Sequence, residues 1–123
     1  IVTSGGYERF KVVDGKRYSH FFDPKTGESV MSDVLSATLV TPDGALADGL
    51  ATAFMIAGFD ESAKILGRLS PMPGAIFIRE GEDGNPEILI SDNLRGTVIK
   101  SLKPVRFFRV SFGELHSLDV ESN

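Results

Sequence analysis

The chain has 123 residues, of which 41% are hydrophobic and 24% are charged, and its formal net charge is −4 at pH 7. These values are typical of one globular domain with its own core, and the acidic balance gives no basis for binding nucleic acid through bulk charge. Cysteine is absent, which excludes disulfides, thiolate metal sites and a cysteine nucleophile. Asp48, Gly49 and Thr52 interrupt the longest apolar run, so no segment is predicted to span a bilayer.

The first part of the chain is predicted to be β-structure. Residues 1–3 read as a strand that starts abruptly, so we expect a piece of a longer protein, with a cleaved mature product as the alternative. Residues 7–13 and 16–22 flank Asp14-Gly15, which is typical of a type I′ hairpin turn. The Asp-Pro-Lys-Thr-Gly sequence at 23–27 predicts a loop.

A buried strand and two helices are predicted next. The β-branched, apolar segment 34–40 favours the strand, and the Ala-, Leu-, Met- and Phe-rich segment 45–57 favours a largely buried helix that ends at Gly58. A second helix is expected from Asp60, as its N-cap, to Leu69, before two prolines stop it.

The last part of the chain again predicts strands. Segments 75–79 and 87–90 flank a polar turn, segments 94–99 and 105–112 are further candidates, and the polar tail 114–123 is expected to fray. Strands on both sides of a helix pair predict an α+β fold, with a mostly antiparallel sheet and the helix pair packed on it.

Asp48 and Thr52 are the first candidates for chemistry. They are four residues apart and would share one helix face, where a carboxylate and a hydroxyl suit a small hard cation such as Mg²⁺. Gly49 and the β-branched Thr52 both disfavour the helix, which hints at a ligand near its start. The alternative is an acid stabilised by the helix dipole.

His20 is the second candidate. It lies just before the 23–27 turn, and because an imidazole titrates near neutral pH, it is a candidate general base or phosphate partner. The alternative is a surface histidine or one with satisfied hydrogen bonds. His116, in the polar tail, is interpreted as solvated.

Backbone and polar groups near these residues are candidates for binding a nucleotide. Lys25 and Thr26 are suited to phosphate, or form only an exposed β-turn. Ser4-Gly5-Gly6 precedes Tyr7-Glu8-Arg9, so a ligand can approach the backbone closely and stack on Tyr7, although a bulge at a strand entry is as reasonable. The sequence contains no GxGxxG or Walker-type loop.

Three motifs occur in a fixed order. They are S-G-x-Y-E-R at residues 4–9, H-x-x-D-P-x-T-G at 20–27 and A-D-x-L-x-T-A at 47–53. Each is weak alone, but their order and spacing make the chain similar to the C-terminal portion of the ApbE family, the FAD:protein FMN transferases. The resemblance covers residues 1–70 well and implies the C-terminal part of an ApbE-like, T-fold-like domain whose N-terminal part is absent.

The resemblance implies an Mg²⁺-dependent enzyme that splits FAD at its pyrophosphate, attaches FMN to a threonine or serine hydroxyl of a target protein and releases AMP. Asp48 and Thr52 match the metal-binding pair, and His20 matches the histidine that assists proton transfer. The contacts to FAD are expected from a further set of residues: Ser4, Gly5, Tyr7, Glu8, Lys25 and Thr26.

The expected partners are FAD, a flavin acceptor such as a respiratory-complex subunit, and the N-terminal part of the same enzyme, in the bacterial cell envelope or periplasm and with a possible lipid anchor upstream. Exposed apolar surface would promote a homodimer or association with the complementary part. Gly6 stands where an acidic or amide residue is common in the family. An FAD pyrophosphatase that yields FMN and AMP, or a non-catalytic flavin- or nucleotide-binding module, are the alternatives.

Overall fold

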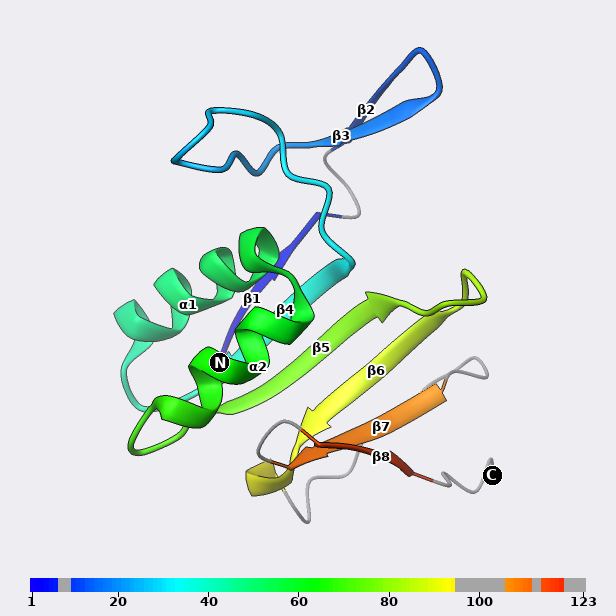
Figure 1. Cartoon of the computed structure of the whole chain (residues 1–123). Coiled ribbons are helices and arrows are strands. Elements are labelled where there is room, and N and C mark those ends of the chain that lie inside the picture. The colour runs from blue at the N-terminus through cyan, green and yellow to red at the C-terminus, as the bar shows by residue number, and fades with distance from the viewer. Residues whose placement is uncertain (7–9, 95–105, 112–113, 119–123) are drawn as a thin grey trace.

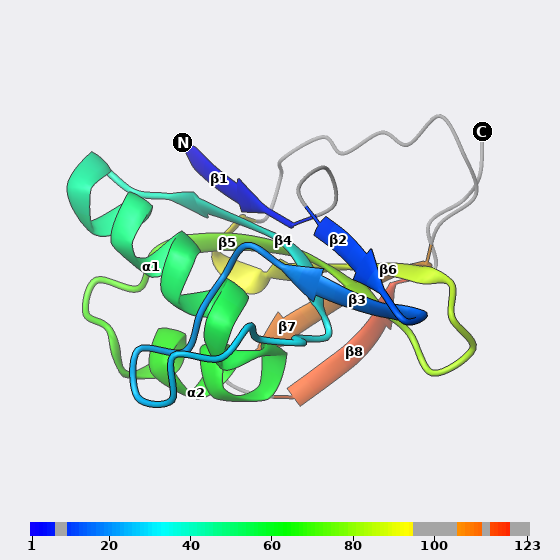
Figure 2. The same cartoon turned by 90° about the horizontal axis from the view of Figure 1, so that it is seen from above.

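The structure, a computed structural model, describes residues 1–6, 10–94, 106–111 and 114–118. A six-stranded sheet has the order β1-β4-β5-β6-β7-β8, and β2 and β3 form a separate two-stranded hairpin. Two helices, α1 and α2, lie on the same face of the sheet (Figures 1 and 2). The elements are β1 (Val2–Gly5), β2 (Phe10–Val13), β3 (Lys16–Ser19), β4 (Val34–Val40), α1 (Gly44–Ala57), α2 (Phe59–Arg68), β5 (Gly74–Glu80), β6 (Pro86–Ser91), β7 (Arg106–Ser111) and β8 (Glu114–Leu118).

The core lies between the sheet and the helices. In β4 the side chains of Ala37 and Leu39 are fully buried, because alternate residues of a strand point to the same face of the sheet. The Phe77 ring of β5 contacts both Phe54 and Phe59 of the helix pair, with centroids 5.6 and 5.3 Å apart. These contacts confirm the α+β fold with a helix pair packed on the sheet.

Helix α1 begins and ends with local hydrogen bonds. The Asp43 carboxylate accepts the Leu46 N–H at 3.0 Å, which satisfies one donor of the first turn, and the Gly58 N–H donates to the carbonyl of Phe54 at 3.2 Å. Gly58 has a φ of +80°, where glycine is favoured, and it ends α1 as predicted.

The predicted start of the second helix is two residues too late. Helix α2 begins at Phe59, with Gly58 as its N-cap, instead of being capped by Asp60. The Asp33 carboxylate, from before β4, accepts the Phe59 N–H at 3.1 Å. A tertiary contact therefore replaces the local cap that the sequence suggested, and the helix ends at Arg68 instead of Leu69.

The hairpin turn is confirmed. Asp14 and Gly15 have φ angles of +51° and +75°, the two positive values that a type I′ turn requires. The second strand is shorter than the predicted segment 16–22, since β3 ends at Ser19 and Phe22 forms only an isolated bridge with Ser29.

The C-terminal strands differ from the prediction in two ways. β7 pairs with β6 in parallel, whereas the other strand pairs of this sheet are antiparallel. The expectation that the polar tail frays is wrong for residues 114–118, which form β8 against β7. Backbone pairing, which the polar side chains do not reveal, explains this strand. Of the predicted strand 94–99, Leu94 ends a 3₁₀ turn and the remainder lies outside the described residues.

None of the helices in the described part of the chain has the length and apolar character needed to cross a membrane.

Candidate functional site

Helix α1 presents Asp48 and Thr52 to solvent. Both residues are exposed, and they are one turn apart on the helix. The side of the helix that packs into the core carries Ala47, Ala51 and Phe54, which are fully buried. Core packing thus fixes the direction in which the carboxylate and the hydroxyl point.

Gly49 lies on the same exposed side of α1. A Cβ atom placed on this glycine would have no neighbour within 4 Å, so no other part of the described chain approaches its backbone. Contacts within the described chain therefore do not require glycine here, although glycine costs the helix about 1 kcal/mol relative to alanine.

Ser4 brings a second hydroxyl to this face. In β1 it pairs with Ala37 of β4, and its side chain lies on the side of the sheet that carries the helices. Its Oγ is 3.4 Å from Oγ1 of Thr52. The structure therefore brings two predicted site residues, Ser4 and Thr52, together at the contact between β1 and α1, and Asp48 lies one helix turn from Thr52.

His20 directly follows β3 and is exposed. Its ring lies 4.0 Å from the ring of Phe21, centroid to centroid. It lines a groove of about 610 Å³ together with Tyr18 and Phe22. The groove therefore gives an entering group access to the His20 imidazole.

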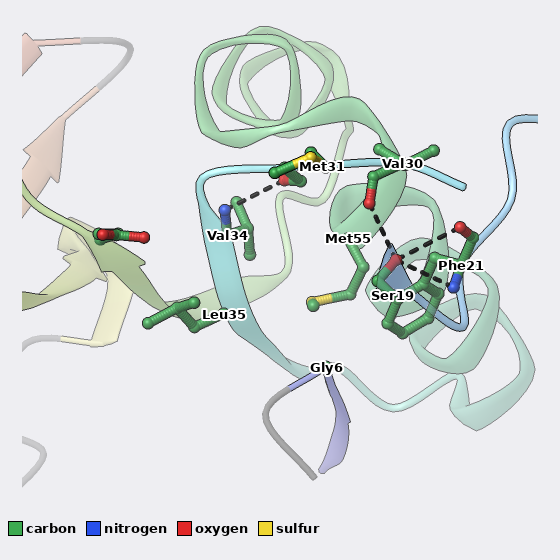
Figure 3. Close-up of a pocket in the computed structure, with 10 residues that line it drawn as sticks. Gly6, Ser19, Phe21, Val30, Met31, Val34, Leu35 and Met55 are labelled. Atoms are coloured by element: carbon green, nitrogen blue, oxygen red, sulfur yellow. Dashed lines mark hydrogen bonds between the residues drawn. The ribbon is translucent and has the colours of Figure 1, made fainter. Parts of the chain in front are cut away.

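Phe21 connects the segment that carries His20 to helix α1. Its ring is nine-tenths buried and lies beside Gly6 and near Met55 of α1 (Figure 3). A Cβ atom on Gly6 would be 3.6 Å from Phe21 and 3.5 Å from Met55. These three residues line a small cavity of about 110 Å³ (Figure 3). A Cβ atom at Gly6 would be in ordinary van der Waals contact with Phe21 and Met55, so the first side-chain atom has room at this position.

Ser19 and Ser29 hold the ends of the 20–28 segment together. The Ser19 hydroxyl donates to the carbonyl of Val30 at 2.9 Å (Figure 3). The Ser29 hydroxyl donates to the carbonyl of Ser19 at 2.8 Å. Sequence reasoning missed both serines and Phe21. The only signal was the position of these residues in or next to the motif that begins at His20.

Lys25 and Thr26 lie in the tight turn after His20. The Asp23 carboxylate accepts the Lys25 N–H at 2.7 Å, the Thr26 hydroxyl accepts the Glu28 N–H at 3.2 Å, and Gly27 has a φ of +69°. These local hydrogen bonds order the turn, and the side chains of Lys25 and Thr26 are exposed. Gly5 of β1 pairs with Ser36 of β4. Tyr7 and Glu8 lie outside the described residues.

The donor set of the α1 face fits part of a magnesium site. Mg²⁺ binds one or two carboxylates, keeps several waters and shares substrate phosphates, so Asp48 with the Thr52 hydroxyl is a suitable partial set. Within the described ranges, no group of three or more His, Asp or Glu residues is placed to hold a metal alone. A cation here would thus need ligands from the substrate, from water or from outside these ranges.

An ion pair on α2 changes the pKa values of its two members. The Lys64 ammonium, 2.6 Å from the Glu61 carboxylate, lowers the pKa of Glu61, and Glu61 raises the pKa of Lys64. Both side chains are exposed and belong to the other helix. This pair therefore has no part in the α1 face.

Comparisons with a family profile and with individual proteins agree on one family. A profile described as "ApbE family" matches residues 1–77. A protein named "FAD:protein FMN transferase" from Treponema pallidum is 45% identical over 78 residues, which cover 63% of this chain and 21% of that protein. The protein of the same name from Vibrio cholerae is 37% identical over 87 residues, covering 71% and 25%.

Solved structures agree. The flavin transferase ApbE from Vibrio cholerae superposes with a TM-score of 0.64 and 30% identity, over 79% of this chain and 29% of that chain. The apo flavinyl transferase ApbE from Pseudomonas stutzeri gives a TM-score of 0.65 and 29% identity, over 80% and 31%. The chain spans between a fifth and a quarter of the length of the two curated relatives described above.

Proposed function

The chain belongs to the ApbE family, and from that premise we propose that it forms part of an enzyme that transfers FMN from FAD to a hydroxyl group of a protein. The observation that carries the proposal is the exposed face of α1. There a carboxylate and a hydroxyl, Asp48 and Thr52, are held in fixed directions by a buried helix side.

The reaction exchanges one phosphorus–oxygen bond for another. The acceptor hydroxyl oxygen forms a bond to the FMN phosphorus, the bond from that phosphorus to the bridging oxygen breaks, and AMP leaves with the bridging oxygen. His20 would take the proton of the hydroxyl, which makes the attacking oxygen more nucleophilic. The Lys25 ammonium would sit near pyrophosphate oxygens and offset their negative charge.

Asp48 and Thr52 would hold Mg²⁺. When bound, this ion supplies positive charge that offsets the charge of the pyrophosphate oxygens during phosphoryl transfer. The support for this assignment is the chemistry of the donor set, since carboxylate and hydroxyl oxygens are hard ligands.

The acceptor and its compartment are also proposals. The relatives' name specifies a protein as FMN acceptor, and we propose a threonine or serine of a respiratory-complex subunit in the bacterial cell envelope.

The test uses the complete gene product, FAD, Mg²⁺ and a respiratory-complex subunit as the acceptor. The subunit is supplied without FMN. We expect the subunit band to fluoresce in a denaturing gel, with one AMP released for each flavin attached. Release of free FMN and AMP with an unlabelled subunit would mean that the enzyme is an FAD pyrophosphatase. Tight FAD binding without either product would indicate a binding module.

A further inference from the structure

Ser4 is a polar residue in an apolar part of the sheet. On the helix-facing side of β1 and β4 its neighbours are Val2, Ala37 and Leu39. Packing against α1 would favour another apolar side chain at this position. Instead, the Ser4 hydroxyl lies 3.4 Å from the hydroxyl of Thr52, at the rim of the β1–α1 contact.

A hydroxyl that binds a cation has a directional requirement. It must turn an oxygen lone pair to the ion, so its proton has to point away from the ion to an acceptor. Binding to a cation also makes that proton a stronger donor. For Thr52, the neighbouring side-chain oxygen that the structure supplies is Oγ of Ser4.

We propose that Ser4 is a positioning residue for the candidate metal ligand Thr52, and this inference rests on the proposed function. The Ser4 oxygen accepts the Thr52 hydroxyl proton and so holds the Thr52 oxygen toward the cation. Outer partners of this kind orient metal ligands, and their loss typically weakens metal affinity by about 10- to 100-fold. The separation of 3.4 Å is long for a hydrogen bond between hydroxyls, and it should shorten when the cation is bound.

The same strand supplies a matched control. Thr3, the preceding residue, points to the opposite face of the sheet, where its hydroxyl is 2.9 Å from that of Thr38. Replacing Thr3 by valine removes a hydroxyl pair from the same pair of strands without touching α1. Any general effect of losing a β1 hydroxyl should therefore appear in Thr3→Val as well.

The experiment measures Mn²⁺, as a paramagnetic substitute for Mg²⁺, binding to the complete gene product with FAD present and no acceptor. Free Mn²⁺ is quantified by electron paramagnetic resonance for the wild type, Ser4→Val, Ser4→Thr and Thr3→Val. Valine and threonine have the same shape, so the two Ser4 variants differ only in the hydroxyl. We expect about tenfold weaker Mn²⁺ binding in Ser4→Val, and near wild-type binding in Ser4→Thr and Thr3→Val.

The outcomes separate this inference from the proposed function. Equal Mn²⁺ affinity for Ser4→Val and Ser4→Thr, in a wild type that binds Mn²⁺ and transfers FMN, overturns the positioning role and leaves the function intact. A wild type that neither binds Mn²⁺ nor transfers FMN overturns both. If Ser4→Val and Ser4→Thr bind Mn²⁺ equally weakly and both lower the melting temperature, the loss of affinity comes from packing at this position and the inference fails.

Discussion

The candidate site is divided between helix α1 and the β2–β3 hairpin with the segment that follows it. These two regions differ in how far their apolar side chains are buried. In α1 the side chains of Ala47, Ala51 and Phe54 are fully buried beneath Asp48 and Thr52. Around His20, by contrast, the exposed fractions are 52% for Val13, 58% for Phe22 and 73% for Met31. The buried side chains of α1 are therefore sufficient to orient Asp48 and Thr52.

The hairpin side depends on fewer contacts. The buried ring of Phe21 joins it to the core, and the hydrogen bonds of Ser19 and Ser29 close the ends of the 20–28 segment. Its apolar surface is the kind that a second copy, or a complementary part of the same enzyme, would cover. Association of this type stays a prediction.

The largest expected effect contrasts the packing of the two regions. Phe54→Ala opens a cavity under α1 and should lower the free energy of unfolding by about 3–5 kcal/mol. Phe22→Ala removes the same ring from an exposed position and should change it by no more than about 0.5 kcal/mol. Urea unfolding of the complete gene product, followed by circular dichroism, measures both. Similar losses would mean that Phe22 is buried in the complete protein.

The next effect separates chemistry from packing on α1. Asp48→Asn should reduce FMN transfer roughly 100- to 1,000-fold, because an amide binds Mg²⁺ far more weakly than a carboxylate. The melting temperature should barely change, since Asp48 is exposed. The control is Asp60→Asn, an exposed acid in the first turn of α2, which should retain transfer. Full activity in Asp48→Asn would remove this carboxylate from the site.

His20 is the corresponding test on the hairpin side. His20→Gln should lower the rate about 100-fold through loss of a general base. Tyr18→Phe, two residues earlier in the same groove, should keep the wild-type rate. A wild-type rate in His20→Gln would assign the base elsewhere.

The smallest effect concerns the exposed turn. Lys25→Gln should raise the KM for FAD by about threefold with kcat unchanged, because an exposed charge contact contributes no more than about 1 kcal/mol. The difference should shrink in high salt. Lys16→Gln, at the hairpin turn, serves as the matched charge control and should leave KM as it is.

Much of this fold follows from local sequence rules. The Asp14-Gly15 turn was predictable because only a few residues tolerate its positive φ angles, and α1 was predictable from its composition and its terminal Gly58. The start of α2 was not predictable, because the carboxylate that accepts the first N–H of this helix belongs to Asp33, 26 residues before Phe59. Strand β8 was not either, since its partner β7, and not its own polar side chains, makes it a strand.

The candidate site was predictable in its residue types but not in its arrangement. Helical spacing placed Asp48 and Thr52 on one face. The approach of Ser4 to Thr52 depends on the register of β1 against β4 and on the packing of α1, which connect residues 48 positions apart. The anchoring of the His20 segment by Phe21 depends in the same way on a tertiary contact beside Gly6 and Met55.

The most direct test is a crystal structure of the complete gene product with FAD and Mn²⁺, with data collected for anomalous scattering. The account predicts an anomalous peak in bonding contact with the Asp48 carboxylate and the Thr52 hydroxyl, with FAD pyrophosphate oxygens completing the shell. A peak bound to other residues, with Asp48 and Thr52 still facing solvent, would contradict it.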